Sequence, residues 1–287
     1  MTKKESTAVF SDEEIDELIE RCREVKDMGY MGSEKLYKFI QRYFTPTVVG
    51  LENIPKEPTL FIGNHSFLGI DGFVVMPVLW HEANRFARAL GDTAWLQTPR
   101  VGDRMISNGM LLAHPKVCSA MMQDGHDLLV YPGGAHESMK AAANAYELQW
   151  RQRYGFVRMA AQNGYNITPF GVVGPEECFD HAMEGDELLD TWLGKLLSQR
   201  GVRPDMVPPV PSGVFSTLLP KPQPCYVAFG EPVEVPDYSG KKTVPNSVQQ
   251  SVREETAGRI EDLIKDMLLL QAQGRRDQSR LRRFLTR

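Results

Sequence analysis

The sequence has few cysteines, and they lie far apart. Its four cysteines include no pair with the Cys-x-x-Cys spacing that is typical of zinc and dithiol sites. They are Cys22, Cys118, Cys178 and Cys225. The sequence therefore carries no zinc signature, predicts no metal site, and fits a protein of a reducing compartment.

Long apolar runs and an excess of positive charge are also missing. The longest apolar run, residues 72–80, is about half as long as the ~20 residues that a membrane-spanning helix needs. The N-terminus runs into a charged segment, so no secretory signal is expected. A formal charge of −4 argues against a nucleic-acid partner. We therefore expect a cytoplasmic protein without a transmembrane helix, whose membrane contact would be peripheral.

What the sequence does contain is an alternation of strand-like and helix-like segments. With 42% hydrophobic and 24% charged residues over 287 positions, the chain has enough apolar material for a large core. Strands are predicted at residues 60–63, 85–90, 127–131, 167–171 and 225–229, and helices at 72–82, 116–123, 155–162 and 188–199. This order predicts an α/β fold, a single layered domain with a central, mostly parallel sheet flanked by helices.

The two ends of the chain differ from this middle part. A capping box at residues 11–14 and a second helix after Ser33 predict an N-terminal helical hairpin over 1–45, packed on an α/β domain over 46–240. The proline-rich residues 202–224 are predicted to form a long segment on the surface. Residues 241–287 are expected to form a C-terminal helix, at 248–271, and a basic tail with six arginines after residue 273. That tail suits an anionic membrane surface, or is a solvated end.

A histidine and an aspartate follow the first predicted strand of the domain. The segment from Gly63 to Asp71 places His65 just after a glycine turn and Asp71 where the next helix begins. An imidazole acts as a base when a carboxylate fixes its tautomer and stabilises the imidazolium that forms. The alternative is a turn whose histidine caps a backbone group and whose aspartate N-caps the helix.

A second loop follows the predicted strand at residues 127–131. It reads Tyr131-Pro132-Gly133-Gly134 and continues to His136 and Glu137. Paired glycines let backbone N–H groups approach a ligand closely, although they also suit a plain tight turn. In a parallel sheet the two loops are expected to lie side by side at the carboxyl ends of the strands.

These segments, together with residues 167–170, resemble the ordered blocks of glycerolipid and lysophospholipid acyltransferases. The resemblance covers about residues 46–236, and it is strongest to the branch of monoacylglycerol and diacylglycerol acyltransferase-like proteins. It implies transfer of an acyl group from a thioester, acyl-CoA or acyl-carrier protein, to a lipid hydroxyl. His65 would be the general base and Asp71 would orient it. No metal or other cofactor is implied, because the thioester is already activated.

Two departures from the family pattern bear on the acceptor. Five residues, instead of four, separate His65 from Asp71, and Gly133 and His136 stand where phosphate-accepting members carry Glu and Arg. Because an arginine fork is the natural ligand of a phosphate, the resemblance implies a neutral acceptor such as a mono- or diacylglycerol or another alcohol. The expected substrate-binding residues are Asn64, Gly133, Gly134, His136 and Glu137.

Two other functions stay open at this point. One is a lysophospholipid or glycerol-phosphate acyltransferase, and the other is a non-catalytic lipid-binding protein of the same fold. Four arginines between the two loops could receive the phosphates of a CoA donor. These are Arg85, Arg88, Arg100 and Arg104.

Overall fold

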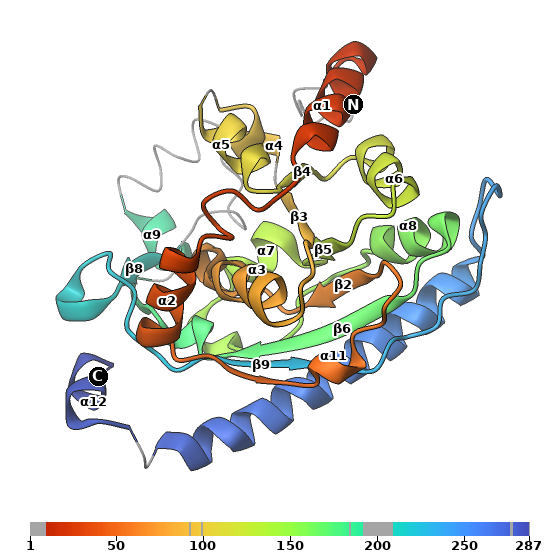
Figure 1. Ribbon diagram of the computed structural model, residues 1–287. Helices are drawn as coiled ribbons and strands as arrows, with labels where there is room; N and C mark the ends of the chain where they lie inside the picture. The colour runs from red at the N-terminus through yellow and green to blue at the C-terminus, as the bar shows by residue number, and fades with distance from the viewer. Residues whose placement is uncertain are drawn as a thin grey trace.

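A single sheet runs through the middle of the computed structural model, which describes residues 10–91, 93–98, 100–183, 185–191, 209–275 and 278–286 (Figure 1). Over this part of the chain the main sheet has seven strands in the order β1-β9-β6-β2-β5-β3-β4. Neighbouring strands are parallel except for the antiparallel pair β6–β9. Their bounds are β1 Thr47–Val49, β2 Leu60–Gly63, β3 Arg88–Gly91, β4 Leu111–Leu112, β5 Leu128–Val130, β6 Ile167–Val173 and β9 Tyr226–Phe229.

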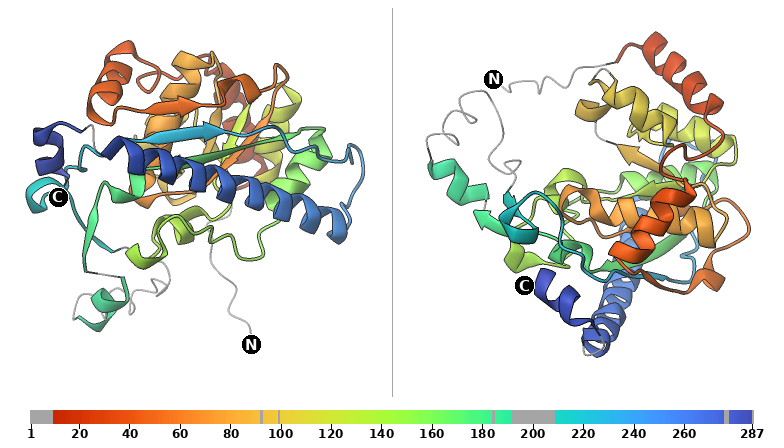
Figure 2. Two further views of the ribbon diagram at one scale, coloured as in Figure 1. Left: turned by 90° about the horizontal axis from the view of Figure 1, so that it is seen from below. Right: turned by 60° about the vertical axis from the view of Figure 1, so that its left-hand side comes forward.

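Helices cover both faces of this sheet. The longest described helix, α11, lies along β6 and β9, as the view from below shows (Figure 2). The helices are α1 Asp12–Glu24, α2 Glu34–Tyr43, α3 Ile70–Glu82, α4 Thr93–Leu96, α5 Val101–Ser107, α6 Pro115–Gln123, α7 Gly134–Ser138, α8 Gly155–Asn163, α9 Gly185–Asp190, α11 Asn246–Gly274 and α12 Arg280–Leu285. In the described ranges no helix is both long enough and apolar enough to cross a bilayer.

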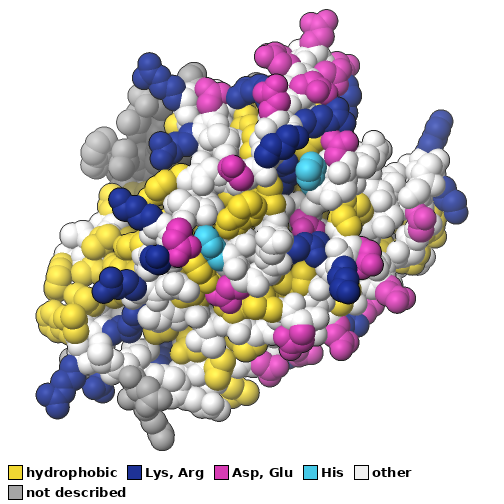
Figure 3. All heavy atoms as spheres, viewed as in Figure 1, with side chains coloured by type: hydrophobic (Ala, Val, Ile, Leu, Met, Phe, Trp, Pro, Cys, Tyr) yellow, Lys and Arg dark blue, Asp and Glu magenta, His cyan; other side chains and the backbone are white. Residues whose placement is uncertain are grey.

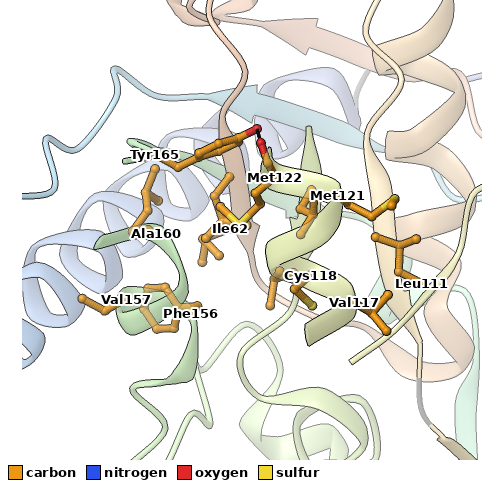
Figure 4. Packing of buried hydrophobic residues seen from close by; sticks show 14 of the residues in the cluster. Ile62, Leu111, Val117, Cys118, Met121, Met122, Phe156, Val157, Ala160 and Tyr165 are labelled. Carbon is orange, nitrogen blue, oxygen red and sulfur yellow. Dashed lines mark hydrogen bonds between the residues drawn. The ribbon is translucent and has the colours of Figure 1, made fainter. Parts of the chain in front are cut away.

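Alternate residues of the central strands feed two hydrophobic clusters, one on each face. Leu60 and Ile62 of β2 point to the face covered by α1, α6, α8 and α11, whereas Phe61 points to the face covered by α2 and α3. Figure 4 shows part of the first cluster, where Ile62 lies among side chains from α6 and α8. Because both faces are buried, β2 is a continuous apolar run, as is usual in parallel sheets. The predicted α/β layering with a mostly parallel sheet is confirmed.

The two N-terminal helices differ from the hairpin expected over residues 1–45. Both are present, and Ser11 forms the capping box at the start of α1. However, α1 packs on α6 and α5, whereas α2 packs on α3. The buried residues of α1 and α2 belong to different core clusters. Each helix therefore packs on the α/β domain, as expected, but through a different cluster from the other helix.

Several other boundaries also differ from the expectation. The strand predicted at 85–90 is β3, and it begins only at Arg88. The backbone N–H of Arg85 instead donates to the Leu79 carbonyl of α3 at 2.9 Å. Of the helix predicted at 188–199, residues up to 190 lie in α9, and 192–199 lie outside the described residues. In the surface segment predicted at 202–224, residues 202–208 lie outside the described ranges. Within its described part, β8 (Val210–Ser212) pairs with β7 (Asp180–Met183).

Candidate active site

The candidate catalytic pair lies at the carboxyl end of β2. A Cβ at Gly63 would lie 2.3 Å from the ring of Phe170, so only glycine fits where this strand ends. Two residues later the His65 Nδ1 lies 2.9 Å from the Asp71 Oδ2, and Asp71 sits in the first turn of α3. Asp71 is fully buried, whereas the His65 side chain is 18% exposed. The carboxylate is thus shielded from water, while part of the imidazole remains accessible.

The second carboxylate oxygen of Asp71 holds the turn together. The backbone N–H and the hydroxyl of Ser66 both donate to Asp71 Oδ1, at 3.0 and 2.5 Å. The Asp71 N–H in turn donates to the Ser66 Oγ at 3.1 Å. Asp71 therefore closes the turn before α3 with one oxygen and contacts the imidazole with the other. The alternative in which Asp71 N-caps the helix is wrong, because Gly69 is the N-cap of α3 and no side chain caps it.

The charges of this pair shift both pKa values. Burial acts to lower the pKa of the His65 imidazole, but the Asp71 charge and hydrogen bond outweigh it, so this pKa is raised above its ordinary value. Burial likewise acts to raise the pKa of Asp71, but His65 and the hydrogen bonds from Ser66 outweigh it and hold it below its usual value. Asp71 stays ionised and favours an imidazole that accepts protons readily.

Tyr131, which follows β5, forms a platform for the imidazole. The His65 and Tyr131 rings are stacked, with their centroids 4.2 Å apart and their planes 13° apart. Tyr131 also meets Phe170 edge-on, with centroids 5.8 Å apart. The platform role of Tyr131 was missed at the sequence level. The available signal was an aromatic residue at the end of a strand predicted to lie beside the histidine loop.

Glu137, at the end of the second loop, contacts the backbone of His65. It is fully buried, and its Oε1 accepts the backbone N–H of His65 at 2.9 Å. Burial raises the pKa of Glu137 to about 7, against the opposing charge of Lys140. Lys140 itself forms a buried ion pair with Glu176 at 2.6 Å. One oxygen of Glu137 thus fixes the backbone of His65, while the buried Oε2 has no hydrogen-bond partner among the described residues.

The paired glycines also serve the fold of their loop. A Cβ at Gly133 would lie 1.8 Å from the Glu137 Oε2, so the glycine makes room for that carboxylate. Gly134 has φ +51° and donates its N–H to the Tyr131 carbonyl at 2.9 Å. The Gly134 N–H, expected to meet a ligand, is therefore occupied within the turn.

Arginines from a later segment bind this loop from outside. The Arg153 Nη1 donates to the carbonyls of Pro132 and Gly133, at 2.9 and 2.7 Å. The Arg151 Nη2 lies 3.4 Å from the Nδ1 of His136, and this histidine is half-buried. Neither arginine was predicted to lie near this loop, because both lie outside the motifs that carry the resemblance.

The remaining polar candidates have structural partners. The Asn64 amide is buried, accepting the Val172 N–H at 2.8 Å and donating to the Val172 carbonyl at 2.9 Å. It therefore ties the histidine loop to β6, and both ends of its amide are used in doing so. Of the arginines considered for CoA, Arg85 pairs with Asp127 and the buried Arg88 donates to the carbonyls of Cys22 and Val25. Only Arg100 and Arg104 among these four are exposed.

Residues 21–248 match the family model described as diacylglycerol acyltransferase. The chain belongs to this family. Family membership confirms the resemblance to glycerolipid acyltransferases and to their diacylglycerol acyltransferase-like branch, and it extends the matched region beyond residues 46–236. Over the described residues, no group of three or more His, Cys, Asp or Glu side chains is placed to hold a metal ion.

The proteins that are similar to this chain in sequence include acyltransferases. Phytyl ester synthase 2 of Arabidopsis thaliana is 29% identical over 218 residues, covering 66% of this chain and 29% of that protein. Diacylglycerol O-acyltransferase 2B of Umbelopsis ramanniana is 26% identical over 255 residues, covering 81% of this chain and 71% of that protein. The chain thus spans under a third of the plant enzyme. A crystal structure of the acyltransferase PlsC from Thermotoga maritima aligns with a TM-score of 0.47 and 15% identity, covering 86% of this chain and 87% of that one.

Proposed function

We propose that this protein is an O-acyltransferase that moves a fatty acyl group from a thioester to the hydroxyl of a neutral lipid or another alcohol. The donor would be acyl-CoA or acyl-carrier protein. Membership of the diacylglycerol acyltransferase family supports the reaction class. The acceptor class draws on the names of the relatives, which refer to diacylglycerol and to phytyl esters. Both names point to alcohols without a phosphate.

The observation that carries the mechanism is the His65–Asp71 contact of 2.9 Å. When the Nδ1–H of His65 donates a hydrogen bond to Asp71, the unprotonated Nε2 is free to accept the proton of the acceptor hydroxyl. The alkoxide oxygen then attacks the thioester carbonyl, and the C–S bond breaks as the ester forms. The proton held at Nε2 passes to the departing thiolate, which restores the neutral imidazole. Asp71 stabilises the imidazolium between these two proton transfers.

The experiment offers one acyl-CoA, or one acyl-carrier protein, with a mixed pool of acceptors and identifies the product by mass. The pool contains monoacylglycerol, diacylglycerol, a long-chain alcohol, lysophosphatidic acid and glycerol 3-phosphate. We expect an ester of a neutral acceptor from the wild-type protein and none from His65→Ala. His114→Asn is the matched control, because this histidine caps α6 far from β2 along the chain and asparagine preserves the cap. An active His65→Ala protein would overturn the mechanism.

A phosphate-bearing acceptor is the second candidate, and one observation favours it. Arg151 and Arg153 reach the loop in which phosphate-accepting relatives carry their arginine, although they come from a different segment. Product formed only from lysophosphatidic acid or glycerol 3-phosphate would support this candidate. Binding of lipids without thioester consumption would instead indicate the non-catalytic alternative.

A further inference from the structure

Several large apolar side chains are exposed to solvent at one end of the molecule. They lie on the loop at residues 213–219 and on α12, and we call them the apolar rim. Its members and their exposed fractions are Phe215 70%, Leu218 75%, Leu219 54%, Leu281 67% and Phe284 61%. In Figure 3 a hydrophobic patch bordered by blue side chains lies on the left, where Figure 1 places this loop and α12. A soluble surface seldom gathers this much exposed apolar area in one place without a binding role.

The rim is built by specific contacts and is not a frayed end. The Phe215 and Phe284 rings lie 6.0 Å apart and join the loop to α12. Arg282 anchors α12 by donating to the carbonyls of Tyr43 and Pro222, at 3.2 and 2.9 Å. In the loop, the Gly213 N–H donates to the Thr217 carbonyl at 2.7 Å. These contacts hold the apolar side chains outward.

The loop also adopts a backbone that non-glycine residues avoid. Phe215 and Ser216 have φ values of +52° and +58°, in the left-handed region. Such conformations persist only where the surrounding contacts determine them, and they cluster at functional sites. Phe215, at one of these two positions, is among the most exposed apolar side chains of the described residues.

The charged side chains around the rim are mostly positive, although the chain as a whole carries a formal charge of −4. Asp180 of β7, which lies beside Phe215 and Phe284, is paired with Lys221 at 2.6 Å. Arg280 and Arg283 are exposed on α12, next to Leu281 and Phe284 in the sequence. Arg42, whose carbonyl accepts from Arg282 at 3.1 Å, is exposed close to the same anchor. Apolar side chains interleaved with arginines suit the interface of an anionic bilayer, where the former enter the acyl region and the latter contact headgroup phosphates.

The rim is connected to the candidate active site through the small β7–β8 sheet. β8 leads directly into the rim loop, and its Ser212 is in register with Asp180 of β7. Next to Asp180, Phe179 and His181 meet the ring of Phe67 edge-on, with centroids 6.0 and 5.6 Å away. Phe67 follows His65 by two residues. The rim therefore stands at the end of the sheet where β2 delivers the histidine.

We propose that the apolar rim is a membrane-docking surface that inserts into an anionic lipid leaflet and brings the His65 loop to its lipid substrates. The direction of substrate supply rests on the proposed acyltransferase function, whereas the binding itself does not. The occupant is a lipid surface because the arginines complement anionic headgroups.

Binding is measured by co-sedimentation with vesicles of phosphatidylcholine containing roughly one third phosphatidylglycerol, with no acyl donor present. The apolar variant combines Phe215→Ser, Leu218→Ser and Leu219→Ser, and the charge variant combines Arg280→Gln and Arg283→Gln. We expect both to bind roughly tenfold or more weakly, and the charge variant to lose the preference for anionic over pure phosphatidylcholine vesicles. Leu269→Ser is the matched control, because this leucine of α11 is 64% exposed and lies outside the rim.

A second measurement separates this proposal from the proposed function. Acyl transfer to a short-chain, water-soluble alcohol should be unchanged in both rim variants, while transfer to an acceptor embedded in vesicles should fall with binding. Wild-type protein that does not sediment with anionic vesicles, or rim variants that sediment as the control does, would overturn the docking surface. So would sedimentation equilibrium showing a wild-type dimer that the apolar variant breaks, because the rim would then bind a second copy. If the wild-type protein binds vesicles but transfers no acyl group to any acceptor, the proposed acyltransferase function is wrong and the docking surface stands.

Discussion

The imidazole of His65 lies flat against the phenol ring of Tyr131, with ring centroids 4.2 Å apart. The two residues follow neighbouring parallel strands, since Ile62 of β2 is in register with Val130 of β5. Asp71 holds one edge of the imidazole and Tyr131 covers one face, so the ring has little freedom to rotate. Fixing a base in this way removes orientational freedom that would otherwise add to the activation barrier.

Replacing Tyr131 tests this platform. We expect Tyr131→Phe to keep kcat within a few-fold, because the stacked ring is retained, and Tyr131→Leu to lower kcat by roughly a hundredfold, because the imidazole can tilt. Steady-state kinetics on both variants, with circular dichroism to establish that each is folded, provides the measurement. Equal activity of the phenylalanine and leucine variants would show that the stack plays no part in the reaction.

Replacing Asp71 tests the origin of the raised His65 pKa. Only neutral imidazole accepts a proton, so the rate should rise with pH through the His65 pKa, which lies above 6.5. In Asp71→Asn the Ser66 hydrogen bonds can persist, but the charge that raises the pKa is gone and the amide favours the wrong tautomer. We expect kcat to fall by roughly 10³- to 10⁴-fold and the acidic limb of the pH–rate profile to move to lower pH. An acidic limb at the same pH in both proteins would contradict the assignment of the base.

The sequence predicted the meeting of two loops but not the direction of every side chain in them. Strands at 60–63 and 127–131 are apolar runs, and parallel neighbours end at the same edge, so the approach of His65 and Tyr131 follows from pattern alone. Asn64 and Glu137 stand in the same loops, yet they turn to backbone groups 108 and 72 residues away in the chain. Such partners depend on the packed sheet, and a polar residue in a glycine loop looks the same whether it faces a ligand or the protein.

The N-terminal helices illustrate the same limit. The capping box at Ser11 predicted where α1 begins, because a cap is a contact between residues three apart. The surface on which α1 packs was not predictable from that signal. An apolar helix face specifies only that some apolar partner exists, and here α6 provides it.

Glu137 should make stability depend on pH. Its pKa rises from 4.5 to about 7 on folding, so between these values the folded protein binds more protons than the unfolded chain. By linkage, this contribution to stability is fully present below about pH 4.5 and is lost as pH rises through about 7. Glu137→Gln keeps an acceptor for the His65 N–H and cannot ionise.

We therefore expect the difference in unfolding free energy between Glu137→Gln and wild type to shift in favour of the variant by about 2–3 kcal/mol from pH 5 to pH 8. Urea unfolding at several pH values measures it, and Glu52→Gln, an exposed carboxylate, is the control. A difference that is constant across this range would show that Glu137 ionises as freely in the folded protein as in the unfolded chain.

Asn64 should matter for stability and for the position of the histidine loop, with no direct effect on substrate affinity. Asn64→Ala removes two hydrogen bonds and leaves the N–H and carbonyl of Val172 without that partner inside the core, so we expect a loss of roughly 2–4 kcal/mol in unfolding free energy. Asn53→Ala, which removes one bond to the Phe229 carbonyl, should cost about 1 kcal/mol. Urea unfolding compares the two variants, and kinetics below the unfolding transition should show Asn64→Ala lowering kcat with KM little changed. A raised KM with unchanged stability would instead place the Asn64 amide against the substrate.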